Sequence, residues 1–226
     1  MRLTQRAYDF GRILVDWWLV NGKEYPWRNE RTPYRVLVSE YMLIRTKAKN
    51  VIKPYMEFIE KLPSVESLPS DKCLWDACSK AFNSLGLPKR REALFETLKT
   101  LRNRSRVPKD SSELEELPLV GQYIRAAVRV FGFGIPDGII DSNVLRLLGR
   151  YAGLNVKDSL RRTRLFAETV NEFRYDEKIV EYSYGLLDYA SSICTKSPRC
   201  AECLFKSHCC HAKPPSRRDQ YEQSQV

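Results

Sequence analysis

The sequence predicts an all-α protein, and three observations carry this prediction. Apolar residues recur at helical spacing along most of the 226 residues, no segment shows the strict alternation of a half-buried strand, and residues that begin or end helices stand at the expected places. Hydrophobic residues make up 43% of the chain and charged residues 29%, which is typical of a globular protein and excludes disorder of the whole chain. A chain of this length forms one large domain or two small ones.

The first expected helix places Phe10, Ile13, Leu14 and Trp17 at positions i, i+3, i+4 and i+7, and Gly22 ends it. Two later helices have recognisable starts, since Ser70 or Asp71 opens the segment 71–82 and Pro88 takes the first position of a helix that carries Leu94, Phe95, Leu98 and Leu101 on one side. The other expected helices are 36–44, 51–62 around Pro54, 122–133, 142–151, 160–173 and 177–190.

Lysine and arginine exceed aspartate and glutamate by 38 to 28, which gives a net charge of +10 and an isoelectric point near 9.3. A polyanion is the expected partner, although an anionic membrane surface or a need for solubility would produce the same charge. No apolar run approaches the roughly 20 residues of a membrane span, and Asp9, Arg12 and Asp16 interrupt the apolar stretch that a secretory signal needs. We therefore expect an intracellular, cytoplasmic protein without a membrane partner, with residues 213–226 as a disordered tail.

Five of the seven cysteines lie close together, as Cys194, Cys200, Cys203, Cys209 and Cys210. Four thiolates that close on one centre suit either a tetrahedral zinc ion or an iron-sulfur cluster. Zinc ribbons use two short knuckles, whereas only Cys200 and Cys203 form one here, so the spacing favours the cluster. Packed or incidental cysteines are the alternative.

Three further features could carry chemistry. The segment 117–123 forms a short connection that opens a helix and exposes backbone N–H groups able to hold a phosphate, although proline and glycine also occur in such connections for geometric reasons. Asp141 follows two isoleucines and precedes a helix, so it is a helix N-cap, a catalytic carboxylate or both. Glu40 is a lone acid in the apolar segment 36–44, where it is paired, protonated or directed into a cavity, unless it faces water at the rim.

Together these features resemble the helix-hairpin-helix DNA glycosylase superfamily, which includes endonuclease III and the adenine glycosylase MutY. The matching segments are Leu117 to Gly121 with Tyr123, Ile140 to Arg146 and the cysteine loop. Within the superfamily, the branch of MutY and the archaeal thymine-DNA mismatch glycosylases is most similar, through Tyr25 to Arg28, Pro33 and Tyr34, and Ser39 and Glu40 with Thr46. Two departures stand out, since Leu119 replaces the usual hairpin glycine and five residues rather than six separate Cys194 from Cys200.

The resemblance implies a two-domain helix-hairpin-helix fold with a C-terminal iron-sulfur loop. One domain, 27–133, would end in the hairpin, and the other would combine 1–26 with 134–212. Double-stranded DNA containing a mismatch would be gripped across the cleft by a monomer, with Asp141 opposite Glu40 and Tyr123. A 4Fe-4S cluster, or alternatively zinc, would be held by Cys194, Cys200, Cys203 and Cys209, with Cys210 as a spare thiol.

The resemblance also implies the reaction. Bifunctional members carry a lysine at the position of Tyr123, and its amine forms a Schiff base before strand cleavage. Tyrosine cannot, so we expect a monofunctional glycosylase without lyase activity, in which Asp141 stabilises the positively charged sugar. MutY has a Gln-Gln pair in place of Ile44 and Arg45, a serine in place of Tyr123, and a further C-terminal domain that we expect this chain to lack. These differences favour thymine or uracil opposite guanine as the substrate, with Glu40 binding the flipped pyrimidine or positioning water.

The expected DNA contacts come from two regions. Leu117, Leu119, Gly121 and Gln122 of the hairpin would contact phosphates, while Arg45 and residues after 86–88, with Lys89 and Arg90, would enter the opened duplex. A solvated charge run is an equally weighted interpretation of residues 89–91. The alternative functions are a MutY-like glycosylase that removes adenine from A:G or A:8-oxoguanine, a noncatalytic DNA-binding protein and a zinc-stabilised one.

Overall fold

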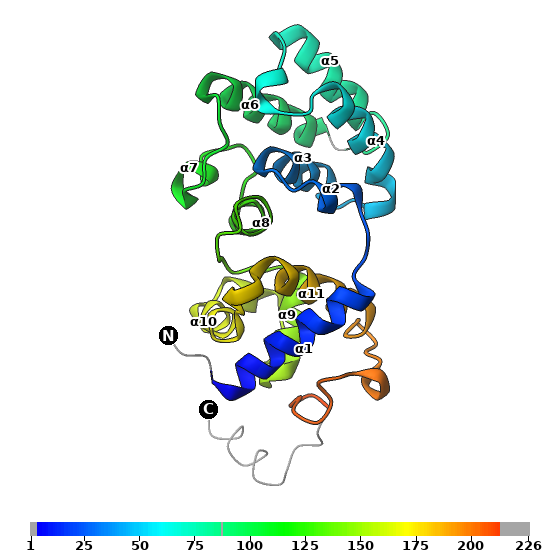
Figure 1. The fold of residues 1–226 in the computed structure, drawn as a ribbon, viewed down its shortest axis with the longest axis vertical. Coiled ribbons are helices and arrows are strands. Elements are labelled where there is room, and N and C mark those ends of the chain that lie inside the picture. The colour runs from blue at the N-terminus through cyan, green and yellow to red at the C-terminus, as the bar shows by residue number, and fades with distance from the viewer. Residues whose placement is uncertain (1–3, 87, 213–226) are drawn as a thin grey trace. The chain divides into compact units, whose positions relative to one another are not determined.

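The computed structural model describes residues 4–86 and 88–212, and every regular element in these ranges is a helix (Figure 1). The prediction of an all-α fold is therefore confirmed for this part of the chain. The segment 213–226, expected to be disordered, lies outside the described residues. No helix of the described ranges is long and apolar enough to cross a membrane.

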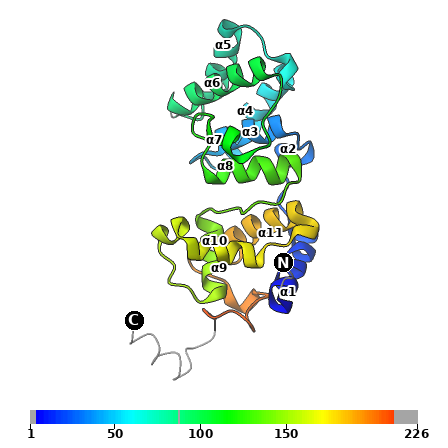
Figure 2. The ribbon, with the colours of Figure 1, turned by 90° about the vertical axis from the view of Figure 1, so that its left-hand side faces the viewer.

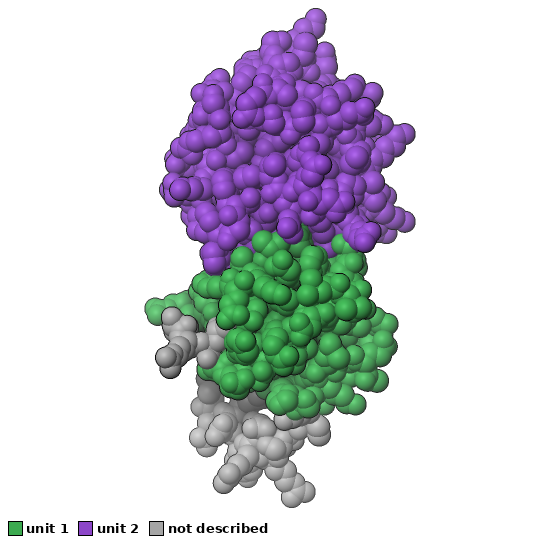
Figure 3. Space-filling view, in the orientation of Figure 1, with its two compact units in different colours: residues 1–23, 138–226 green, residues 24–137 purple. Residues whose placement is uncertain are grey.

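The chain divides into two compact units, coloured separately in Figure 3. Unit 1 combines residues 1–23 with 138–226, and unit 2 is the continuous segment 24–137. The chain therefore enters unit 1, builds unit 2 and returns to complete unit 1.

Unit 2 is built around α3, Pro33–Leu43, most of whose residues are buried. Thr32 begins this helix by accepting a hydrogen bond from the backbone N–H of Arg35 at 3.2 Å, and Pro33 takes the first helical position. The helix contacts α4, α6, α8 and the π-helical turn that follows α8. The surrounding elements are α2 Pro26–Asn29, α4 Ala48–Lys61, α5 Asp71–Phe82, α6 Pro88–Arg104, α7 Ser111–Glu115, α8 Gln122–Ala127 and its π-helical continuation Val128–Gly132.

Unit 1 packs α1, Gln5–Asn21, along α11, Ile179–Ser192, with α9, Ser142–Ala152, and α10, Arg164–Phe173, beside them (Figures 1 and 2). Aromatic side chains from separate elements form its core, and the ring of Phe10 lies 4.4 Å from that of Phe205 and 4.7 Å from that of Tyr151. Phe205 belongs to the cysteine loop and is only 3% exposed. Burial of this ring attaches the loop to the helical core.

The observed helix bounds agree closely with the expected ones, and the segment 71–82 agrees at both ends. The expected helix 160–173 is wrong in its first turn. A 3-10 turn, Asp158–Arg162, precedes α10, and Thr163 between them is extended and accepts a hydrogen bond from the backbone N–H of Phe166 at 3.3 Å. This side-chain cap competes with helix continuation, which periodicity does not register. The sequence does not predict the short helices α2 and α7, because a helix of four or five residues is too short to show a periodic pattern.

Gly11 of α1 offers a test of the packing within unit 1. A Cβ atom at this position would lie 2.6 Å from the Cβ of Tyr175, whose ring also contacts Tyr8 at 5.6 Å and whose hydroxyl donates to Glu177 at 2.8 Å. Gly11→Ala is therefore expected to lower the free energy of unfolding by about 1 to 3 kcal/mol, the usual cost of overpacking. Urea denaturation followed by circular dichroism measures this change.

The matched control is Arg12→Ala, the next residue of the same helix, whose side chain is 54% exposed. This substitution is expected to change the free energy of unfolding by no more than about 0.5 kcal/mol. Equal stability of the two variants would show that α1 does not approach Tyr175 as closely as described.

Candidate functional site

Asp141 is the N-cap of α9, and its carboxylate is held in one orientation. Its Oδ1 accepts hydrogen bonds from the backbone N–H groups of Asn143 at 2.8 Å and Val144 at 2.7 Å, and its Oδ2 accepts one from the side-chain amide of Asn143 at 2.8 Å. The preceding Ile139 and Ile140 are buried and anchor the approach to the helix. The N-cap interpretation of Asp141 is confirmed, and the same contacts fix the direction of a negative charge.

A chain of hydrogen bonds connects this carboxylate to the cysteine loop. The amide oxygen of Asn143 accepts from the Arg146 guanidinium at 3.0 Å. Arg146 also donates to the backbone carbonyl of Cys194 at 2.6 Å and to that of Ala190 at 2.9 Å. Sequence reasoning placed Asn143 and Arg146 in the matching segment but assigned them no role. Their spacing of two and five residues from an N-cap acid was the available signal, because it places both within reach of the first helical turn.

Glu40 lies on α3 with only 7% of its surface exposed, between Ser39 and Tyr41, which are 1% and 0% exposed. Its interpretation as an acid facing water at the rim of the helix is therefore wrong. An ionised carboxylate in such surroundings is costly unless a partner compensates its charge. Buried acids of this kind are often found in functional sites.

The hairpin between α7 and α8 has buried anchors and an exposed tip. Leu117 and Val120 are 3% and 5% exposed, whereas Leu119 is 53% exposed and has a positive φ of 60°. The hydroxyl of Tyr41 donates to the backbone carbonyl of Pro118, which ties the turn to α3. The side chain of Leu117 is thus an internal anchor, and its expected contact with DNA is corrected. Leu119 thus adopts the left-handed conformation that favours glycine, the residue that the resemblance to the superfamily leads one to expect at this position.

Gly121 caps α8 with an exposed backbone, and nothing lies within 4 Å of the place where a Cβ would stand. Gln122 is exposed and Tyr123 half-buried in the first turn of the helix. The first backbone N–H groups of any helix lack intrahelical acceptors, so this turn can receive an anion.

The basic residues expected to enter the duplex differ in their exposure to solvent. Arg45 and Lys89 are exposed. Arg90 is only 2% exposed and donates hydrogen bonds to oxygen atoms of the protein interior, and desolvation lowers its pKa from the ordinary value. Both the expected DNA contact of Arg90 and its interpretation as part of a solvated charge run are therefore wrong.

Cys194, Cys200, Cys203 and Cys209 line one pocket of unit 1, together with apolar side chains that include Phe205. Two donors face the sulfur atoms, because the Arg150 guanidinium lies 3.5 Å from the Sγ of Cys194 and the Tyr189 hydroxyl lies 3.4 Å from that of Cys203. Burial raises the pKa of the Cys194 thiol, and Arg150 opposes the shift. Burial likewise raises the pKa of Cys209.

The four thiols line one apolar pocket, and cysteine thiolates are the ligands of both structural zinc and iron-sulfur centres. Across residues 4–86 and 88–212, no group of three or more His, Cys, Asp or Glu side chains stands in an arrangement that would hold a metal ion. Cys210 is exposed and does not line the pocket, and its Cβ lies 3.1 Å from the place where a Cβ of Gly153 would stand.

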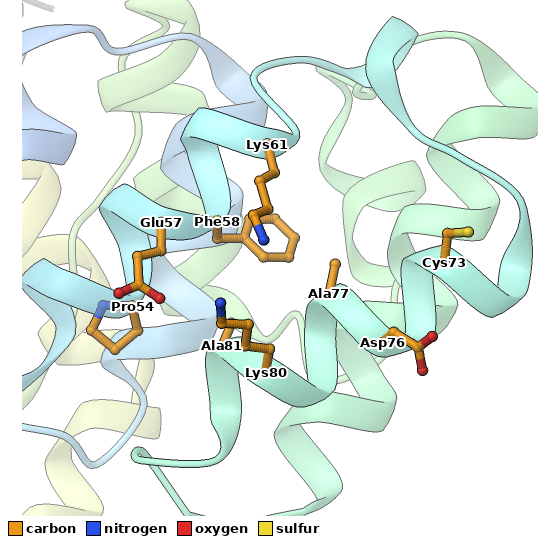
Figure 4. A pocket seen from close by; sticks show the side chains of 9 residues that line it. All are labelled: Pro54, Glu57, Phe58, Lys61, Cys73, Asp76, Ala77, Lys80 and Ala81. Carbon is orange, nitrogen blue, oxygen red and sulfur yellow. The ribbon is translucent and has the colours of Figure 1, made fainter.

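A second pocket, shown in Figure 4, lies between α4 and α5. It combines acidic and basic side chains with the phenyl ring of Phe58, and Cys73 lies at one end. None of the predicted site residues lines it. Its lining residues are Pro54, Glu57, Phe58, Lys61, Cys73, Asp76, Ala77, Lys80 and Ala81.

No family model matches the sequence. The chain is 33% identical over 217 residues to a thymine-DNA glycosylase of Aeropyrum pernix, and the match covers 89% of this chain and 96% of that protein. It is 29% identical over 204 residues to a thymine/uracil-DNA glycosylase of Methanothermobacter thermautotrophicus, with 88% of this chain and 91% of that protein covered. An adenine DNA glycosylase of Buchnera aphidicola is 30% identical over 204 residues, which cover 88% of this chain but 57% of that protein.

Solved structures agree with these relatives. A thermostable thymine-DNA glycosylase superposes with a TM-score of 0.82 and 27% identity, covering 92% of this chain and 97% of that one. A trapped endonuclease III–DNA covalent intermediate superposes with a TM-score of 0.71 at 18% identity, which shows a shared fold. The chain thus belongs to the helix-hairpin-helix DNA glycosylases, in the branch that contains the archaeal thymine-DNA glycosylases.

Proposed function

We propose that the protein hydrolyses the N-glycosidic bond of thymine or uracil opposite guanine in double-stranded DNA and leaves an abasic site. The observation that carries this proposal is the Asp141 carboxylate, fixed at the start of α9 in a chain that matches thymine-DNA glycosylases over nearly their whole length. We infer an intracellular protein that acts as a monomer in base excision repair.

Asp141 would act through its negative charge. As the bond to the base lengthens, the sugar develops positive charge, and a nearby carboxylate stabilises it. The backbone N–H groups of Asn143 and Val144 already orient the Asp141 carboxylate, so little reorganisation is needed during the reaction. Thymine and uracil can leave as anions centred on N1, so no full protonation of the base is required.

Glu40 and Tyr123 would complete the reaction. The buried Glu40 carboxylate is suited to bind the flipped pyrimidine or to position water. Tyr123 has no amine, so no Schiff base can form at this position and the strand stays intact. This assignment makes the enzyme monofunctional.

The choice of thymine over adenine rests on two residues and one comparison. The resemblance implies that a tyrosine at the position of Tyr123 and an arginine in the segment of Arg45 are typical of the thymine mismatch branch. The thermostable thymine-DNA glycosylase shares the fold at 27% identity. The adenine glycosylases of Buchnera are nearly as similar in sequence, so removal of adenine is the second candidate.

DNA binding would use the exposed part of the hairpin and the exposed basic residues. Backbone N–H groups near Leu119, Gly121 and Gln122 can receive a phosphate. Lys89 would contact the backbone, and Arg45 would enter the duplex. A mispaired thymine leaves the helix more easily than a paired one, which contributes to selection of the mismatch.

We further propose that Cys194, Cys200, Cys203 and Cys209 hold a 4Fe-4S cluster. Their shared apolar pocket and the donors from Arg150 and Tyr189 support this assignment, and the position of Cys210 outside the pocket favours Cys209 as the fourth ligand. When bound, such a cluster links four thiolates and so holds the loop in place. A single zinc ion is the alternative centre, and it requires four sulfur atoms about 2.3 Å from one point.

The reaction class is tested with an end-labelled duplex that carries a single T:G mismatch. Excess enzyme is expected to produce strand cleavage only after treatment with alkali, because hydrolysis leaves an intact abasic strand. Cleavage without alkali, or a covalent adduct trapped by borohydride, would show lyase chemistry and contradict the role given to Tyr123.

Asp141→Asn is expected to slow single-turnover excision at T:G by at least about a hundredfold, the scale of one lost charge interaction. Asparagine is as good an N-cap as aspartate, so α9 keeps its first turn and the DNA affinity is retained. Rapid-quench kinetics and fluorescence anisotropy measure the two quantities.

Thr163→Ala is the matched control, because it removes the side-chain cap of α10 in the same unit without touching Asp141. It is expected to cost about 1 kcal/mol of stability and to leave the excision rate unchanged. Wild-type excision by Asp141→Asn would reduce Asp141 to a structural cap.

Cys209→Ser and Cys210→Ser distinguish the fourth ligand. Freshly purified protein is expected to absorb near about 400 nm, as iron-sulfur centres do. Cys209→Ser should lose this absorbance and its bound iron, whereas Cys210→Ser should keep both. A colourless wild-type protein containing one zinc ion would establish zinc as the centre. Loss of iron in Cys210→Ser but not in Cys209→Ser would make Cys210 the fourth ligand in place of Cys209.

A further inference from the structure

Arg90 lies at the start of α6 and connects two turns that are distant in sequence. Its Nη1 donates to the backbone carbonyls of Met42 at 3.0 Å and Ile44 at 2.6 Å, and to the Oγ1 of Thr46 at 2.9 Å. Its Nη2 donates to the carbonyls of Leu85 at 2.7 Å and Gly86 at 3.1 Å. One guanidinium therefore holds the turn after α3 and the turn after α5 together.

The surroundings of Arg90 show that this arrangement is built for a cation. The guanidinium carbon lies 5.6 Å from the centre of the Phe82 ring, and within the described residues no carboxylate forms an ion pair with it. Four of its five acceptors are backbone carbonyl groups, which lie at the end of α3 and in the turns that follow α3 and α5, where the helix dipole favours positive charge. The guanidinium spreads five N–H donors over a planar fork and reaches acceptors of both turns, whereas the ammonium of lysine has three donors on a single nitrogen.

The turn after α3 is strained at Arg45. Ile44 has φ −51° and ψ 114°, Arg45 has φ 51°, and the backbone N–H of Thr46 donates to the carbonyl of Leu43 at 3.0 Å. These values describe a type II turn whose third residue is usually glycine. Arg90 bonds to the residues on both sides of Arg45 and so compensates the cost of the left-handed conformation.

The turn after α5 also contains a residue in the left-handed conformation and is also bound by Arg90. Gly86 has φ 68°, its backbone N–H donates to the carbonyl of Phe82 at 3.2 Å, and nothing lies within 4 Å of the place where its Cβ would stand. Its backbone is open to a partner on the outside, while its carbonyl is held by Arg90 on the inside. Both turns thus combine an exposed outer side with one shared internal support.

We propose that Arg90 is a positioning residue that holds these two turns in a single geometry and thereby sets how strongly the protein distinguishes a mismatched from a matched pair. This proposal rests on the proposed function, in which Arg45 enters the opened duplex. Two turns locked to each other can probe both sides of an opened step without losing conformational freedom on binding. Two independent turns would lose conformational entropy when they bind, and they would bind matched and mismatched pairs with more similar affinity.

The test compares Arg90→Lys and Arg90→Gln with Arg102→Gln. Arg102 lies on the same helix and also donates to a backbone carbonyl, that of Pro69, and to Asp71, so its loss controls for general destabilisation of unit 2. All variants carry Asp141→Asn, so that thymine stays attached to the DNA. Hydrogen exchange at residues 43–47 and 85–86 measures the order of the turns, and anisotropy gives the Kd for T:G and T:A duplexes.

Arg90→Lys is expected to accelerate exchange in both turns and to reduce the ratio of the T:A to the T:G Kd by at least about tenfold, within the range that small misplacements cost. Affinity for the T:A duplex should change less than about threefold, because nonspecific binding depends on phosphate contacts elsewhere. Arg102→Gln should leave both the exchange at these turns and the ratio unchanged.

Three results would overturn the proposal. The first is unchanged hydrogen exchange in both turns of Arg90→Lys. The second is faster exchange in Arg90→Lys with an unchanged ratio of the T:A to the T:G Kd. The third is a decrease of this ratio in Arg102→Gln as large as that in Arg90→Lys. Should Arg90→Gln fail to fold, Arg90→Lys alone decides the outcome. Equal binding of T:G and T:A by the parent protein would instead contradict the proposed function, and the exchange data would still decide whether Arg90 holds both turns.

Discussion

Backbone carbonyl groups at helix ends have no intrahelical partner, and an all-helical chain has many of them to satisfy. In both units of this protein, arginine side chains supply the missing donors. Arg90 binds carbonyls after α3 and α5, Arg146 binds those of Ala190 and Cys194, and Arg150 binds those of Thr195 and Lys196. The turn that carries Arg45 and the loop that carries the cysteines both depend on these contacts.

This constraint changes the meaning of the net charge of +10. A basic composition was first an argument for a polyanionic partner, yet some of its guanidinium groups are used inside the protein. Arg90 is the clearest case, since it is buried and both of its Nη atoms donate hydrogen bonds inside the protein. The residues left to act on DNA are the exposed ones, such as Arg45 and Lys89. Charge therefore supports DNA binding only after the internal arginines have been set aside.

Most helices and the capping position of Asp141 could be predicted from the sequence, because both leave local patterns. Asp141 before an apolar helix and Glu40 inside one were recognisable from their neighbours alone. Burial of Arg90 was not, since a Lys-Arg-Arg run has the same pattern on a surface and at a helix start. Leu117 was assigned to DNA as part of a motif, whereas its side chain packs inside. The start of α10 after Thr163 could not be predicted from periodicity, because a hydrogen bond to the Thr163 side chain sets where this helix begins.

The proposed excision depends on chemistry at one fixed carboxylate and on selection of the base by the residues around it. The most direct measurement is single-turnover excision from four duplexes that differ only in the central pair, namely T:G, U:G, A:G and A:8-oxoguanine. We expect abasic sites at T:G and U:G, with adenine left intact in the other two duplexes. Release of adenine with thymine left intact would contradict this expectation and would assign Glu40 as the acid of an adenine glycosylase.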